Sequence, residues 1–241
     1  MKIIKQIQWV RIFSEGTAIV VSILLAFAID AWWERRSQAA QALALEEGLR
    51  ADFEASQAHV ERWLAGNRRM LDAQAELVRR VRTAEAGAGI TVPTELLLGV
   101  VGAPTYSPTD STYEAALSSG QIVLIENPDL HEALARWRQQ IADTSEDELL
   151  MRDIVVHRLL PELSKSVRLG ELYEFENIVG WFAGEDIELT EREVVVTVTP
   201  PLEAVLAERL FYQGFVVTGL ADIRQAQLDI LDLLGAAAAG N

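Results

Sequence analysis

The chain contains no cysteine in 241 residues and only three histidines. Disulfides, thiolate metal sites and thiol nucleophiles are therefore excluded. His59, His131 and His157 lie far apart in the sequence, so the His-Glu-x-x-His spacing of helical zinc sites is missing. We expect neither a metal nor another cofactor.

Basic residues are also scarce, with 21 Lys and Arg against 36 Asp and Glu and a formal net charge of −15. Because phosphate binding requires clustered Lys and Arg, this balance argues against a nucleic-acid partner. Phosphate-cradling Gly-Lys-Ser/Thr loops, dinucleotide fingerprints and Gly-x-Ser-x-Gly elbows are missing as well. The sequence assigns no catalytic, cofactor-binding or metal residue, and it predicts a protein that is not an enzyme.

One long apolar run stands out near the N-terminus, at residues 12–33. At ~1.5 Å per residue a helix of this length spans ~33 Å, enough for a ~30 Å hydrocarbon core. Trp32 and Trp33 suit the far interface, where indole rings bury their carbons and keep the N–H wet. The run predicts a single transmembrane anchor.

The charges beside the anchor predict its orientation. Lys2, Lys5 and Arg11 precede it, whereas Arg35 and Arg36 follow and are partly offset by the preceding glutamate. This bias favours a cytoplasmic N-terminus and places the remainder outside the cytoplasm, in the periplasm of a Gram-negative cell, with the inner membrane as the location. The expected divisions are a cytoplasmic amphipathic lead-in at 1–11, the anchor at 12–33, an extracytoplasmic helical domain at 34–234 and a flexible tail at 235–241.

A cleaved signal peptide is the alternative for this run, because Ala26-Phe27-Ala28 has the small-x-small form of a cleavage site. The apolar character continues past that point, and no proline or glycine separates it from the following helix. We therefore favour an uncleaved signal anchor.

Small and acidic residues share one face of the anchor: Glu15, Ala18, Ser22, Ala26 and Asp30. Small residues let helices approach closely in lipid, and acidic ones avoid lipid. This face predicts a homo-oligomer or a partner membrane helix beside the lipid bilayer. The alternative is that the two carboxylates simply lie near interfacial water.

The rest of the chain reads as helices of an elongated antiparallel bundle, with at most one short β element. A long helix is expected over 37–85 with a bend near Gly66 and Asn67, followed by short helices at 94–101 and 111–120. Asn127 and Pro128 should start a helix reaching about residue 167. A strand at 194–198 and a helix at 202–234 complete the pattern. The 37–85 stripe comprises Ala42, Leu45, Leu49, Phe53, Ser56, Val60, Trp63, Asn67, Leu71, Gln74, Val78 and Val81.

Two polar or aromatic stretches invite a binding hypothesis. Residues 143–148 alternate acidic and polar side chains, but Glu148 and Ile154 replace the glycine and glutamate of an EF-hand, so we expect a solvated joint in the helix. The aromatic side chains of 170–199 suit the hydrophobic edge of a bundle, with a ligand pocket as the alternative. They are Tyr173, Phe175, Trp181 and Phe182.

Two islands carry a resemblance to a known family. The anchor ends Ile-Asp-Ala-Trp-Trp-Glu-Arg-Arg at 29–36, and a helical corner contains Thr-Tyr-Glu-Ala-Ala-Leu-Ser-Ser-Gly at 112–120 and Ile-Glu-Asn-Pro-Asp-Leu at 125–130. Together they resemble a family of uncharacterised bacterial single-pass membrane proteins. The resemblance implies the anchor and the helical fold and transfers no catalytic or binding residue.

The sequence thus favours a membrane-anchored helical signal-input or interaction module that acts with membrane partners. A ligand-binding accessory subunit of a transporter or enzyme complex is the second hypothesis. A carboxylate-dependent hydrolase, with acidic groups brought together by the fold, is the third.

Overall fold

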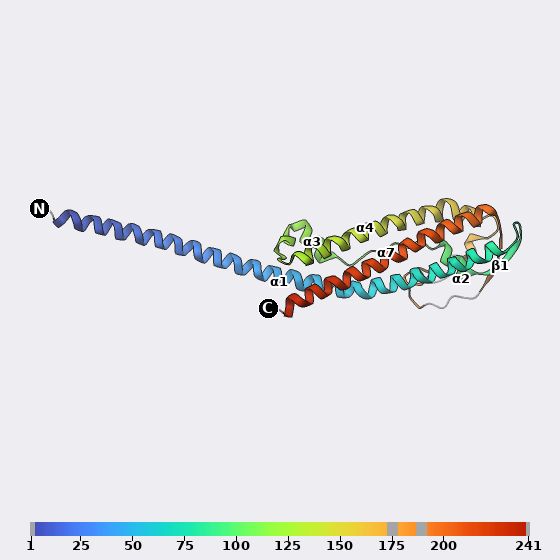
Figure 1. Cartoon of the computed structure of the whole chain (residues 1–241), viewed down its shortest axis with the longest axis horizontal. Helices are drawn as coiled ribbons and strands as arrows, with labels where there is room; N and C mark the ends of the chain where they lie inside the picture. The colour runs from blue at the N-terminus through green and yellow to red at the C-terminus, as the bar shows by residue number, and fades with distance from the viewer. Residues whose placement is uncertain (1–2, 173–177, 187–191, 240–241) are drawn as a thin grey trace. The chain divides into compact units, whose positions relative to one another are not determined.

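A computed structural model describes residues 3–172, 178–186 and 192–239 (Figure 1), with side chains described for most of them. The fold is mainly α, as predicted, and its long helices are α1 (Ile3–Thr83), α4 (Pro128–Ile154) and α7 (Pro200–Ala239). Contacts divide the chain into two compact units. One unit comprises Met1–Gly48 with Thr112–Glu126, and the other comprises Leu49–Ser111 with Asn127–Asn241.

Helix α1 carries the apolar run and continues past it. Its portion Phe13–Thr83 is long and apolar enough to cross a membrane, judged by length and composition, and none of its most apolar window is buried. A core helix of comparable composition would be mostly buried. Trp32 and Trp33 are exposed, and the Arg36 guanidinium lies 5.9 Å from the Trp32 ring centroid.

The helix is not interrupted near Gly66, where a bend was expected, because α1 continues as α-helix through both Gly66 and Asn67. Gly66 has a packing reason instead. A Cβ there would lie 2.5 Å from the Phe182 carbonyl oxygen and 2.7 Å from the Gly184 nitrogen. Gly184 itself has φ of +84°, which a glycine adopts without steric cost. The missing Cβ of Gly66 therefore allows the backbone of α1 to lie against the backbone of residues 182–184.

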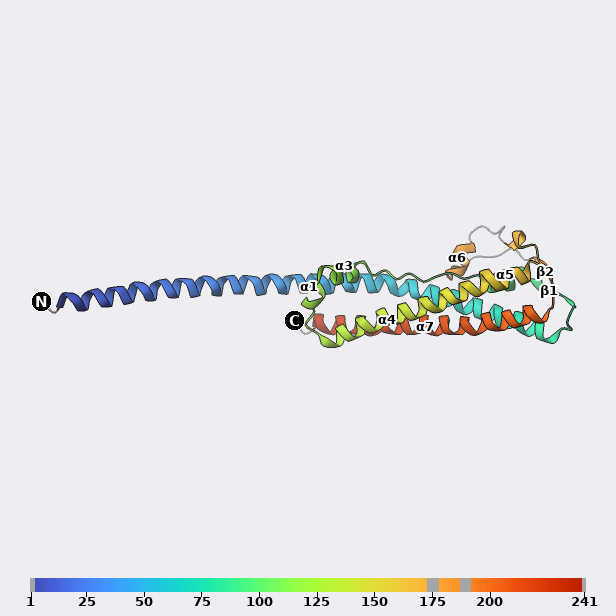
Figure 2. The same cartoon turned by 90° about the horizontal axis from the view of Figure 1, so that it is seen from above.

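The second unit is a bundle in which α1 and α7 run antiparallel. Side-chain contacts pair Ser56 with Gln227 and Gln74 with Arg209, so residue numbers rise along one helix as they fall along the other. Figures 1 and 2 show α4 beside α7 along most of its length. Helix α7 extends five residues beyond the predicted end at 234.

Most of the predicted inner faces are confirmed as buried. In α1 the buried members are Leu45, Leu49, Phe53, Ser56, Val60, Asn67, Gln74, Val78 and Val81. Helix α7 buries Val205, Leu206, Leu220, Ile223 and Leu234 and half-buries Leu210, Val217, Leu228 and Leu231.

The joint expected at 143–148 is also wrong, since α4 runs through it without interruption. Glu148 is buried there, and the next residue, Leu149, is 56% exposed. The irregularity falls later, as a π-helical turn, η2 (Val155–Leu159), where the Leu160 N–H donates to the Val155 carbonyl. Pro161 follows in α5 (Leu160–Leu163). It lacks an N–H and its ring crowds the carbonyl four residues earlier, so the preceding turn widens.

The β element is a two-stranded antiparallel sheet. Strand β2 (Glu193–Thr197) matches the prediction within one residue, and it pairs with β1 (Gly89–Pro93), which the sequence analysis treated as a connection. Val92 faces Val194 in the register, and Val92 and Val196 are both fully buried. The three residues 90–92 are β-branched, which suits a pleated surface.

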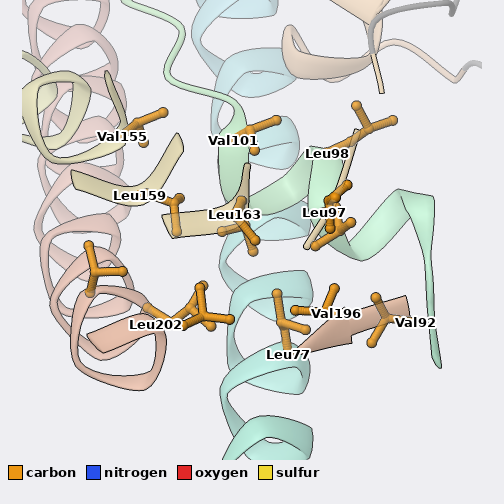
Figure 3. Close-up of a cluster of buried hydrophobic side chains, with 14 of the residues drawn as sticks. Leu77, Val92, Leu97, Leu98, Val101, Val155, Leu159, Leu163, Val196 and Leu202 are labelled. Carbon is orange, nitrogen blue, oxygen red and sulfur yellow. The ribbon is translucent and has the colours of Figure 1, made fainter. Parts of the chain in front are cut away.

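A hydrophobic cluster fills the end of the bundle beside this sheet. Helix α2 (Thr94–Val101) contributes Leu97 and Leu98, and η2 and α5 contribute Leu159 and Leu163. Figure 3 shows these side chains directed toward those of Leu77, Val196 and Leu202. Because side chains from α1, α2, η2, α5, β2 and α7 meet there, this cluster joins the sheet to the bundle.

The first unit contains the helical corner. Helix α3 (Ser111–Ser119) ends at Gly120, whose φ of +75° makes a left-handed stop, and the 3₁₀ turn η1 (Gln121–Leu124) follows. Ser119 donates its hydroxyl to the Ala115 carbonyl at 2.7 Å, so the Ser-Ser-Gly sequence closes a helix.

The start of α4 is capped as predicted. The Asn127 side-chain oxygen accepts from the backbone N–H of Asp129 at 3.0 Å and of Leu130 at 3.4 Å. Pro128 occupies the first turn, where its missing N–H would have had no helical partner. Local sequence therefore determines where the chain turns back into the bundle.

Candidate functional site

A set of buried polar side chains crosses the apolar interior of the bundle. We call it the polar ladder. All its members lie in the second unit, and all are buried. They are Ser56, Asn67 and Gln74 of α1, Tyr106, Glu148 of α4, and Arg209, Gln213 and Gln227 of α7.

Arg209 is the centre of one half of the ladder, and its side chain is fully buried. Its Nη2 donates to the Gly102 carbonyl at 2.6 Å, and its Nη1 donates to Gln213 Oε1 at 2.7 Å and Gln74 Oε1 at 3.4 Å. All three acceptors are neutral. Burial lowers the pKa of Arg209 to about 9, so the guanidinium is held as a cation by dipoles.

Gln213 links this cation to α1. Its oxygen accepts from both Arg209 and Gln74, the latter at 3.1 Å, and its Nε2 donates to Asn67 Oδ1 at 2.9 Å. Gln74 in turn donates to the Gly99 carbonyl at 2.9 Å. Every amide in this half therefore has a partner on another element, which fixes the alignment of α1, α2 and α7.

Tyr106 is the centre of the other half. Gln227 Nε2 donates to the Tyr106 hydroxyl at 3.3 Å and to Ser56 Oγ at 3.2 Å. The Thr109 N–H reaches Ser56 Oγ at 3.4 Å. Burial raises the pKa of Tyr106, and the hydrogen bonds from Ser56 and Gln227 oppose that shift only in part. The phenol is therefore neutral and structural at physiological pH.

Glu148 links α4 to the loop between α2 and α3 that contains Tyr106. Both of its carboxylate oxygens accept from the Tyr106 backbone N–H, at 3.0 and 3.1 Å. Burial raises the pKa of Glu148 to about 7, against the opposing effects of that hydrogen bond and of Arg152. Its charge therefore changes near neutral pH.

The ladder is suited to specifying helix alignment. Its polar atoms bond mainly to one another and to backbone carbonyls, although Arg209 Nε and Gln227 Oε1 have no partner among the described residues. Among those same residues, no three His, Asp or Glu side chains are grouped as a metal site. The hydrogen bonds of the ladder join α1, α4 and α7 across the interior of the bundle.

The three histidines are not brought together as a site. The His59 ring lies 5.5 Å from Trp63 and 5.4 Å from Tyr106, and burial followed by the Arg62 charge lowers the pKa of His59. His157 Nδ1 lies 2.8 Å from Asp153 on the bundle surface.

The aromatic group expected near 170–199 is described only in part. Trp181 is buried beneath the Arg69 guanidinium, which lies 5.3 Å from the ring centroid. Phe182 contacts Trp181 edge-on at 5.5 Å and packs against the hydrophobic cluster. These two rings form an edge of the bundle. Tyr173 and Phe175 fall outside the described residues.

A surface hollow of about 350 Å³ bears on the ligand-binding hypothesis. It lies between α1 and α7 and is lined by Glu61, Arg68 and Arg224 among others. Glu61 and Arg224 already pair across it at 3.1 Å. A ligand would have to compete with that ion pair.

Helical periodicity did not identify Arg209, Gln213 and Glu148 as buried polar residues. A signal existed for two of them, because Arg209 and Gln213 are four residues apart and lie on the apolar stripe of α7. Polar side chains at adjacent core positions of one stripe indicate a shared partner on another helix.

No family model, curated protein or solved structure matches the chain. The resemblance of the anchor and the helical corner to uncharacterised bacterial single-pass membrane proteins stays a prediction.

Proposed function

We propose that this protein is a non-catalytic interaction module held at the bacterial inner membrane by one uncleaved N-terminal anchor. Its N-terminus is cytoplasmic and its helical domain is periplasmic, as the positive charges before the apolar run favour. The module docks a membrane-associated partner. A second copy of the chain is one such partner.

An exposed aromatic pair on α7 is the observation that supports docking. Phe211 is 62% exposed and Phe215 is 46% exposed, and their rings meet edge to face at 4.9 Å. The Tyr212 ring lies beside both, at 5.5 Å from Phe211 and 6.3 Å from Phe215. Clustered apolar rings on a helix surface are unfavourable in water and typical of interfaces.

A photo-crosslinking amino acid placed at Phe211 in the full chain should capture the partner in living cells. We expect a discrete adduct on a denaturing gel, because a docked surface would hold the reactive ring against a protein. Its mass would show whether the partner is another copy of the 26.7 kDa chain.

Asp222 provides the control, since it is exposed on the same helix ~10 Å beyond Phe215 along the axis, at ~1.5 Å per residue. The same amino acid placed there should give little adduct. Equal yields at both positions, or none at Phe211, would contradict the docking surface while leaving the anchor untouched.

Orientation has its own test. A reporter enzyme that folds only in the periplasm, fused after Asn241, should be active because the positive flank keeps the N-terminus inside. Replacing Lys2, Lys5 and Arg11 with glutamine should reduce that activity. Activity of a cytoplasm-only reporter in the parent fusion would reverse the proposed topology.

A further inference from the structure

The first unit brings the helical corner back beside the end of the apolar run. A hollow of about 320 Å³ is lined on one side by Glu34, Ser37 and Gln41 of α1. Its other side is formed by Ser119 to Gln121 with Val123 and Leu124. Figures 1 and 2 both show α3 next to α1.

The packing of α3 gives the direction of this return. At the other end of the corner, a Cβ on Gly48 would lie 2.9 Å from the Thr112 methyl carbon. The chain thus meets α1 near Gly48 and descends to the level of Glu34 before η1 turns it back.

That level coincides with the membrane boundary. Glu34 directly follows Trp33, and Gln41 lies only ~12 Å farther along the helix axis at ~1.5 Å per residue. The headgroup layer on each side of a bilayer is roughly 5–8 Å thick. With Trp32 and Trp33 at the interface, the hollow begins within the headgroups.

The composition of the corner suits that layer. Residues 115–125 carry no charged side chain, although 24% of the whole chain is charged. Val123 is 75% exposed and Leu117 is 41% exposed, so the turn presents apolar side chains outward. Arg35 and Arg36 lie at the same level of α1, where lipid phosphates would pair with them.

We infer that η1 is a second membrane contact, with Val123 inserted at the headgroup boundary of the phospholipid bilayer. The inference rests on the proposed anchor and adds a site that the anchor alone does not require. A shallow apolar insertion supported by nearby cations binds a bilayer reversibly. Through it, the membrane surface holds the corner that precedes α4.

Single-cysteine variants test the depth directly, because the chain has no native cysteine. Val123→Cys, Trp32→Cys and Leu149→Cys are made in the full chain, spin-labelled and reconstituted into phosphatidylethanolamine and phosphatidylglycerol vesicles. Leu149 is the matched control, an apolar side chain that is 56% exposed in the bundle unit. The measurement is the ratio of collision rates with oxygen, which concentrates in lipid, and with a water-soluble nickel complex.

We expect the label at 123 to give a ratio close to that at 32 and severalfold above that at 149. A ratio at 123 equal to that at 149, with a high ratio at 32, overturns the contact and leaves the anchor intact. Low ratios at all three positions overturn the anchor and the proposed function with it. In detergent-free vesicles, Val123→Asp should also raise the nickel accessibility of a label at Gln121, and no change there would count against insertion.

Discussion

Replacing Gln213 with leucine is expected to destabilise the bundle by about 3–4 kcal/mol. The change removes the 2.7 Å hydrogen bond to the buried Arg209 cation and leaves Asn67 Oδ1 without its donor. A hydrogen bond to a charged group contributes about 1.5–3 kcal/mol, and an orphaned buried polar group costs about 1–3 kcal/mol. Guanidinium unfolding of the full chain in detergent micelles, followed by circular dichroism, measures the loss.

Two further variants separate this explanation from general loss of packing. Gln225→Leu changes an exposed glutamine of the same helix and should alter the free energy of unfolding by less than about 0.5 kcal/mol. Arg209→Met combined with Gln213→Leu removes the charge along with its partner, so the double variant should be more stable than Gln213→Leu alone. If the two losses simply add, Arg209 does not depend on Gln213.

Acidification from pH 8 to pH 5 should stabilise the bundle through Glu148. Its folded pKa of about 7 lies above the ordinary glutamate value of 4.5, so the folded state binds more protons than the unfolded state between these values. Stability is therefore fully present below pH 4.5 and is lost as the pH rises through 7, by about 3 kcal/mol. The measurement is the denaturation midpoint across that pH range.

Glu148→Gln should remove most of this dependence, because the amide oxygen still accepts from the Tyr106 N–H but does not ionise. At pH 8 this variant should be more stable than the parent chain, and at pH 5 the two should converge. Glu146→Gln, an exposed neighbour, should keep the parental pH profile. A flat profile in the parent chain would mean that Glu148 titrates as it does in water.

Helical periodicity was sufficient to predict the long helices and most of their inner faces. It also placed Ser56, Asn67 and Gln74 on the buried stripe of α1, although polar side chains interrupt the apolar pattern there. Periodicity does not indicate which residue each buried polar side chain contacts. Gln74 and Arg209 are 135 positions apart, and their contact depends on how α1 and α7 are aligned. Burial of Glu148 was missed for the same reason, since its partner is a backbone N–H in a loop.

The wrongly predicted helix interruptions have a physical explanation. Gly66 and the acidic run at 143–148 resemble breakers when only propensity is considered, but tertiary packing outweighs ~1 kcal/mol of propensity. Pro161 is different, because a missing donor and a steric clash persist in any packing. The interruption therefore appeared one turn before the proline rather than at the weak helix formers. Strand β1 was missed because five residues between two turns give too short a pattern.

The two units are interleaved along the chain, with the boundary crossed after Gly48, Ser111 and Glu126. No single cut separates the apolar segment from the bundle without dividing the first unit. Tyr113 and Ala116, both buried, belong to that unit, so a fragment that begins after Gly48 separates residues 112–126 from the rest of their unit. An exchange of anchors between related proteins must therefore carry residues 112–126 with the first 48. The sequence that accompanies the anchor is therefore discontinuous. It comprises residues 1–48 and 112–126, and residues 49–111 of the bundle lie between them in the chain.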